Sequence, residues 1–434
     1  MQYNAYEGKQ SSLDSEANMY RKWSKTVLVA ISVTALAFGI PNSASAQTSQ
    51  NLDDVLSAPI QNYMQNIEDA YKYPYSDLTE AHLNALLQSD SRDDQQNAIA
   101  SSQAAQDLVC FQKGSLDIIS ASVESSILSS EVISNTAQVA VLETKTIESH
   151  SSDGSTVTLY DGETEDLTSV WQDIHILTLS ASSGNAYTVI SDQLVDYSEY
   201  MQANDLAAFA KKYSKNQNLF GIDSDLPDTA YTDSVPNTQD EGNLPGDTSP
   251  QPRASQISEG RMLNYVDKWT TGPVDTFNTE YPIFKSGGNC TNFVSQAVHA
   301  GGQALVPYNL VTKYFTNVWD YDTEKNDSSR TWSNADYNYK FMLNHSGSFT
   351  AASSVFKTYM GSIIYYDWID SSGANNPDGT LDHANIVVGV SSDGMRYISQ
   401  KSPLRANIPY STFLLKAYSE GKIKISTVEL NLIY

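Results

Sequence analysis

Residues 286–302 read SGGNCTNFVSQAVHAGG, and this stretch decides the fold predicted for the C-terminal part of the chain. Apolar residues recur at helical spacing from Phe293 to Val298, and a pair of glycines ends the pattern. We therefore predict a helix from Cys290 to Ala300, with the cysteine in its first turn. The unpaired N–H groups and the positive dipole at a helix N-terminus favour a thiolate there, which is the nucleophilic form of cysteine.

The segments around this helix predict an α+β fold. Helical spacing recurs at 259–270 and at about 334–344, where Ser333 is the expected cap. Strands rich in Ile, Val and Tyr are expected at 361–368, 383–390 and 395–400. A Ser-Asp-Gly turn at 392–394 makes the last two strands a hairpin.

His383 is the expected partner of Cys290. It begins a predicted strand whose other residues are strongly apolar. A histidine at the mouth of such a strand can face the N-terminus of a helix across a cleft, where the imidazole takes the thiol proton and later returns it. The two residues therefore predict nucleophilic catalysis through an acyl-enzyme.

The run from Gly287 to Gln296, followed by Ala300-Gly301-Gly302, resembles the nucleophile motif of a bacterial family called putative amidase domains. Three later segments fit the same family in the same order, namely TWSNA at 331–335, GSIIYYDW at 361–368 and DHANIVVG at 382–389. The resemblance covers about residues 260–420. The family is similar to papain-like cell-wall hydrolases such as the CHAP and NlpC groups. The resemblance therefore implies a papain-like hydrolase of amide bonds, with Cys290 as nucleophile and His383 as base.

The third catalytic residue has three candidates. In papain-like folds a polar residue on the strand after the histidine usually holds the imidazole, which favours Gln400 over Asn385 and Asp367. The family often has a histidine near this point, where the chain has Lys401. The residues expected at the oxyanion hole or along the substrate groove are Asn289, Asn292, Asp367, Asn385, Trp332 and Trp368. Core packing is an equal alternative for the two tryptophans, and a turn role is the alternative for Asn289, where the family usually has aspartate.

The region from 47 to 220 predicts a small α+β accessory domain with a curved meander sheet. Helical spacing runs from Gln47 to about Gln112, and a last helical piece is expected near 202–214. Between them, strands are expected at 115–130, 135–149, 154–160, 168–182 and 185–195. We find no catalytic residues in this region, which is expected to position substrate, cover the cleft or bind another wall component.

Residues 221–257 are crowded with Pro, Gly, Asp and Ser and predict an extended linker. The expected organisation is a signal-peptide region at 1–46, the accessory domain at 47–220, this linker, and the amidase domain at 258–434. In the signal-peptide region, basic residues from Arg21 to Lys25 precede an apolar run, and small residues up to Ala46 supply a cleavage site. The true start is Met1 or Met19. We expect a secreted, extracellular protein, either free or associated with the cell wall, and an uncleaved anchor is the alternative.

The composition limits the partners. The chain carries 51 acidic against 26 basic residues, a net charge of −25, so nucleic acid is not an expected partner. Its two cysteines, Cys110 and Cys290, form either one long-range bridge or a structural and a reactive thiol, and they match no zinc pattern. We expect no cofactor and no metal, and a peptide or peptidoglycan substrate. A silent binding module and an acyltransferase are the alternative functions.

Overall fold

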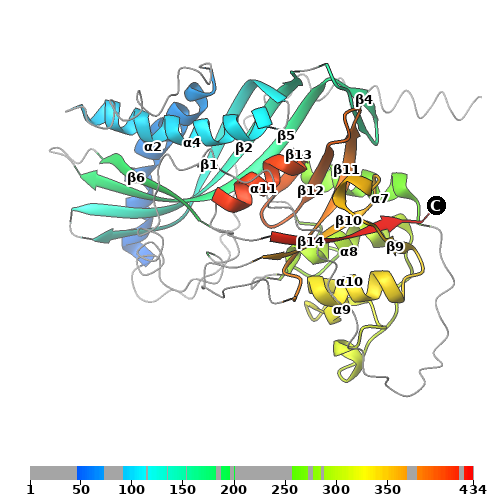
Figure 1. Cartoon of the computed structure of the whole chain (residues 1–434). Helices are drawn as coiled ribbons and strands as arrows, with labels where there is room; N and C mark the ends of the chain where they lie inside the picture. The colour runs from blue at the N-terminus through cyan, green and yellow to red at the C-terminus, as the bar shows by residue number, and fades with distance from the viewer. Residues whose placement is uncertain are drawn as a thin grey trace, which may run out of the picture. The chain divides into compact units, whose positions relative to one another are not determined.

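Figure 1 shows the fold as a computed structural model. The structure describes residues 46–72, 91–113, 116–133, 135–152, 154–181, 187–195, 200, 257–271, 277–284, 288–368, 379–419 and 425–433. Contacts within the chain group it into two compact units, Met1–Thr48 and Ser49–Tyr434. The predicted signal peptide, except for Ala46, and the linker, except for Ile257, lie outside the described residues, as does the helical piece at 202–214.

The described chain before residue 200 consists of two helices followed by six strands. The helices are α2 (Ala46–Ala70) and α4 (Arg92–Lys113). The strands are β1 (Leu116–Ile133), β2 (Thr136–Ser151), β3 (Val157–Leu159), β4 (Gly162–Thr164), β5 (Asp166–Ala181) and β6 (Tyr187–Val195). Five of these strands overlap the predicted ranges, and β4 is an additional short strand that pairs with β3.

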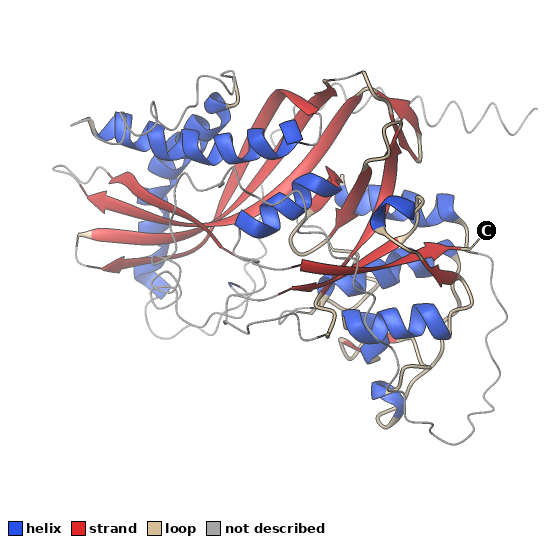
Figure 2. Ribbon diagram, viewed as in Figure 1, coloured by secondary structure: helices blue, strands red, loops and turns tan. Residues whose placement is uncertain are grey.

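In the central parts of β2 and β5, consecutive side chains are buried, so both faces of these strands are covered by other parts of the protein. On one face, Val139 and Leu177 pack with Ile60 of α2. On the other face, Ala140 and Ile174 belong to a smaller apolar cluster. Figure 2 shows α2 and α4 beside these strands.

The chain after residue 257 alternates helices and strands. The helices are α7 (Glu259–Thr270), α8 (Asn289–Gly301), α9 (Arg330–Ser333), α10 (Ala335–Asn344) and α11 (Tyr410–Ser419). The strands are β7 (Tyr321–Asp322), β8 (Asp327–Ser328), β9 (Phe349–Ala351), β10 (Ile363–Trp368), β11 (His383–Ser391), β12 (Arg396–Gln400), β13 (Arg405–Pro409) and β14 (Ile425–Leu432). None of the described helices is long and apolar enough to cross a membrane.

The predicted cap of α10 was wrong by one residue. Asn334 caps the helix, and its side-chain oxygen accepts a hydrogen bond from the backbone N–H of Tyr337 at 3.1 Å. Ser333 instead ends the short helix α9, and its hydroxyl is bonded to that of Ser328 at 3.0 Å. The four-residue helix α9 has no periodic signal of its own, so the sequence did not reveal that Ser333 belongs to it.

Twelve of the described strands form one antiparallel sheet, β7 and β8 form a separate two-stranded sheet, and the fold class is α+β as predicted. The main path runs β1-β2-β5-β13-β12-β11-β10-β14-β9, with β6 also beside β5 and β3 beside β11. Strand β5 pairs with β13 through Val170 and Trp171, and further along it pairs with β6. Regions on either side of the predicted linker therefore share one sheet, which can be followed through β5, β13 and β12 in Figure 1.

The largest apolar core also draws on both regions. Trp171 of β5 belongs to the same cluster as Phe293 of α8, Trp332 of α9 and Ile386 of β11. Helix α8 is buried along nearly its whole length and packs against β11. This packing brings the predicted nucleophile helix to the strand that begins with His383.

Candidate functional site

Helix α8 begins at a glycine that no other residue could replace without strain. Gly288 is the N-cap, and its φ of 89° lies in the left-handed region. A Cβ atom at this position would lie 2.6 Å from the carbonyl oxygen of Ser333, too close for any side chain. No side chain caps the helix, so its first turn presents backbone N–H groups beside Cys290. The turn therefore places the cysteine at the positive end of a helix dipole.

Cys290 is a free thiol that is only 8% exposed, and His383 beside it is 5% exposed. Burial raises the pKa of the thiol, but the charge of His383 and a hydrogen bond from its ring outweigh burial. The hydroxyl of Thr291, 3.7 Å from the sulfur, and the backbone N–H of Ala384 lower the pKa further. The net result of all these effects is a thiol pKa lowered from 9.0 to about 7. The pair predicted from the sequence therefore meets in the structure.

Gln400 holds the opposite side of the imidazole. Its side-chain oxygen lies 2.7 Å from Nε2 of His383, in a buried position. An amide oxygen can only accept, so Nε2 carries a proton and Nδ1 is left to exchange one with Cys290. The amide nitrogen of Gln400 donates to the carbonyl oxygen of Pro403 at 3.2 Å, which fixes the orientation of the amide. Of the three candidates for an orienting residue, Gln400 is the one with this contact.

Aromatic rings enclose the imidazole. The Trp368 ring lies nearly parallel to that of His383, at 5.0 Å between centroids and an angle of 24°. The Phe413 ring is also nearly parallel, at 6.1 Å and 17°. Trp368 is partly exposed, and its role along a substrate groove stays a prediction.

Four of the other predicted site residues have mainly structural contacts. The Asn289 side chain is bonded to both the N–H and the carbonyl of Phe284, at 3.0 and 2.6 Å, and so fixes the turn before α8. The Asn292 oxygen accepts from the Trp332 indole N–H at 2.7 Å. Asn385 donates to the hydroxyl of Tyr366 at 2.7 Å.

The prediction that Trp332, Asn292 and Asn385 line the oxyanion hole or the substrate groove is therefore wrong, because these residues are 0%, 1% and 0% exposed and lie in the interior. Trp332 is part of an aromatic core and stacks on Tyr281 at 5.9 Å. Asp367 is also buried, and one of its oxygens accepts from the N–H of Gly379 at 2.9 Å. Burial of this kind depends on which elements cover the residue, which spacing along the chain does not reveal.

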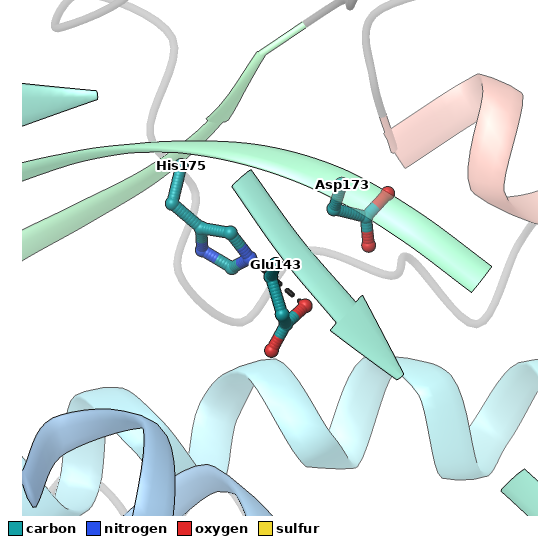
Figure 3. Close-up of side chains that lie close together, drawn as sticks. All are labelled: Glu143, Asp173 and His175. Atoms are coloured by element: carbon teal, nitrogen blue, oxygen red, sulfur yellow. Dashed lines mark hydrogen bonds and ion pairs between the residues drawn. The ribbon is translucent and has the colours of Figure 1, made fainter. Parts of the chain in front are cut away.

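A second set of buried ionisable groups lies between β2 and β5. Glu143 is paired with Asp173 across the two strands, and His175 follows on the same face. Figure 3 shows these three side chains close together. His175 is bonded through Nε2 to Glu143 at 3.0 Å and through Nδ1 to Asp192 at 2.8 Å.

Within the described ranges, Glu143, Asp173 and His175 offer metal-ligating atoms that lie within 4.8 Å of one another. The ammonium of Lys145 lies 2.9 Å from Glu143 and 3.4 Å from Asp173, and 2.5 Å from a carboxylate oxygen of Asp107. It already supplies the positive charge that a bound cation would bring. Both nitrogens of His175 also face carboxylates, so neither is left as a ligand. These residues do not fit a metal site, and we assign them a structural role.

The charges of this cluster stabilise one another. Burial lowers the pKa of His175, but the carboxylates of Asp192 and Glu143 outweigh it and raise that pKa to about 10. Burial likewise opposes the charge of Lys145, and Asp107 and Glu143 raise its pKa well above the ordinary value. Both bases are therefore charged at neutral pH. This cluster was not predicted, although charged residues at alternate positions of the expected strands, as in Glu143-x-Lys145 and Asp173-x-His175, were a usable signal.

Residues 256–425 match the family model described as "Putative amidase domain", which confirms the resemblance predicted for about residues 260–420. Among curated proteins, the "Uncharacterized protein YjcM" of Bacillus subtilis (strain 168) is 29% identical over 151 residues, which are 34% of this chain and 31% of that protein. The chain thus spans about a third of the length of this relative. No solved structure matches the chain.

We expect Cys290 to react with iodoacetamide with an apparent pKa near 7, because the thiolate is stabilised above that pH by His383. The rate should fall as the pH drops through this value. His383→Ala should raise the apparent pKa toward that of an ordinary thiol. The rate is measured by mass spectrometry of the peptide that contains Cys290, from about pH 5 to 10. His345→Ala, a histidine outside the site, is the control and should leave the profile unchanged. A wild-type profile centred near the ordinary thiol pKa would contradict this geometry.

Replacing the buried ammonium of the second cluster should strongly destabilise the protein. Lys145→Met leaves the carboxylates of Asp107, Glu143 and Asp173 without their shared counter-ion, and we expect the free energy of unfolding to fall by about 3–5 kcal/mol. Urea unfolding followed by circular dichroism measures the change. Lys72→Met removes an exposed ion pair with Asp69 and should cost less than about 1 kcal/mol. Equal effects of the two variants would show that the buried cluster is not stabilised as described.

Proposed function

We propose that the chain is a secreted cysteine amidase that hydrolyses amide bonds through an acyl-enzyme on Cys290. The observation that carries the proposal is the contact of the Cys290 thiol with the ring of His383, which lowers the thiol pKa to about 7. Gln400, 2.7 Å from the other ring nitrogen, holds the imidazole for proton transfer. The match of residues 256–425 to a putative amidase domain supports amide hydrolysis.

In this mechanism the Cys290 thiolate attacks the carbonyl carbon of the amide, and the carbonyl π electrons move onto oxygen. The backbone N–H of Cys290 is the donor that we assign to this oxyanion. When the tetrahedral intermediate collapses, the C–N bond breaks and the leaving amine takes a proton from Nδ1 of His383. Water then attacks the thioester and gives a proton to His383. Release of the carboxylic acid restores the thiolate and the imidazolium.

We also propose that the domain is papain-like, with the nucleophile at the start of a helix, the histidine at the start of a strand and the orienting residue on the next strand. Three neighbouring elements support this arrangement. Helix α8 packs against β11, and β11 pairs with β12 through Ile386 and Ser399. Gln400 follows directly on β12 and reaches back to His383.

Peptide stems of peptidoglycan are the substrate that we propose. The signal peptide expected at 1–46 would bring the enzyme outside the cell, and the resemblance to papain-like cell-wall hydrolases points to the wall. Trp368, partly exposed and stacked on His383, offers a flat aromatic surface beside the reacting bond.

The test is digestion of purified peptidoglycan, followed by mass spectrometry of the released fragments and by an assay of new amino groups. Cys290→Ala and His383→Ala should each lower the rate by about a thousandfold or more, because each removes a group that acts in the chemical step. Cys110→Ala is the matched control and should retain activity.

Three results would contradict the proposal. Equal fragments from wild type and Cys290→Ala would exclude the cysteine mechanism. The absence of fragments from wild type, with Cys290 reacting as an ordinary thiol, would favour a silent binding module. If added glycinamide appears in the products in place of water, the acyl group is transferred to an amine and the activity is acyl transfer.

A further inference from the structure

We propose that Arg405 and Asp173 are positioning residues for the Gln400–His383 pair, so that the region before residue 200 completes the site of the amidase domain. The inference rests on the proposed function and assigns a role to the N-terminal region. It is carried by a continuous series of buried contacts from His383 to strand β5. Neither Arg405 nor Asp173 needs to touch substrate.

The first step runs from the imidazole to a turn. Gln400 is the last residue of β12, and its amide is held between Nε2 of His383, at 2.7 Å, and the carbonyl of Pro403, at 3.2 Å. The turn at 401–404 therefore determines where the amide oxygen lies. Gln400 is also paired with Arg405 across β12 and β13, so the two ends of the turn are joined.

The second step runs from the turn to β5. The carbonyl of Leu404 accepts hydrogen bonds from the backbone N–H of Gln172 and from the Arg405 guanidinium, both at 3.0 Å. The guanidinium also donates to the carbonyl of Gln172. Leu404 is 2% exposed and packs with Val170 of β5. The turn is thus attached to a strand from the other side of the predicted linker.

The third step is a buried ion pair. A second guanidinium nitrogen of Arg405 donates to Asp173 at 2.8 Å, and both side chains are 3% exposed. The guanidinium also lies 4.7 Å from the centre of the Trp171 ring, whose indole N–H donates to the same oxygen of Asp173 at 3.0 Å. On its far side Asp173 faces Lys145. Both terminal nitrogens of the guanidinium are hydrogen-bonded, and the group lies over an aromatic ring. Its orientation is therefore fixed, and β5 determines the position of Arg405.

The family match at 256–425 includes Arg405 but not Asp173. Without β5, Arg405 would keep its charge and lose its carboxylate partner, its aromatic platform and one backbone acceptor. The turn before it would then be free to shift, and Gln400 with it. We infer that residues of β5 keep the imidazole oriented toward Cys290.

The test measures the pH profile of Cys290 alkylation in the full chain, because a merely stabilising contact would not move it. Arg405→Met, Asp173→Asn and Gln400→Ala should each raise the apparent pKa of alkylation by about one pH unit. Arg405→Met combined with Gln400→Ala should shift the profile no further than Gln400→Ala alone, since Arg405 acts through Gln400. If Arg405→Met does not fold, Arg405→Lys keeps the charge without the fork and should shift the profile in the same direction.

Tyr63→Phe is the control for general destabilisation. It removes the hydroxyl bond to Asp192 at 2.6 Å, in the same buried network but away from Arg405, and should leave the profile unchanged. A wild-type profile for Arg405→Met or Asp173→Asn would overturn the inference, as would an equal shift for Tyr63→Phe. These outcomes do not depend on the substrate. Failure of the proposed function appears separately, as peptidoglycan cleavage that survives Cys290→Ala.

Discussion

The candidate site depends on one packing constraint, which is that helix α8 begins where strand β11 begins. This brings the thiol of Cys290 and the imidazole of His383 together away from water. Burial alone would raise the thiol pKa, and the charge of the ring, together with hydrogen bonds to the sulfur, reverses that effect. Gly288 allows the turn before α8 to lie against the carbonyl of Ser333, where a side chain would collide. Gln400 then decides which ring nitrogen faces the sulfur.

Strand β5 is the second constraint, because it borders both β2 and β13 and carries buried charge between them. The carboxylates of the network are Asp107, Glu143, Asp173 and Asp192, and the bases are Lys145, His175 and Arg405. Burying so many charges contributes little net stability, since the cost of desolvation offsets most of the attraction between opposite charges. Such groups do, however, tolerate only one arrangement. A shift of β13 along β5 would separate Arg405 from Asp173, so the network selects a single register.

The three residues that meet at the candidate site were predictable because their signals are local. Cys290 follows a glycine turn and opens an apolar helix, His383 opens an apolar strand, and Gln400 lies on the strand after it. The lining of the site was less predictable. Trp332 and Trp368 are the same residue type in similar polar and apolar surroundings, yet the first is buried in the core and the second is partly exposed beside His383. The difference arises from the elements that pack over each of them.

The local elements, the α+β class, the expected contact of Cys290 with His383 and the match of residues 256–425 to the putative amidase model could all be predicted from the sequence. These follow from periodicity, turn residues and motifs within short stretches of chain. The pairing of β5 with β13, and the contact of Asp173 with Arg405, a residue 232 positions away, became visible in the folded chain alone. Such a pairing depends on strand edges and buried charges that must match across the whole fold, and no local pattern encodes it.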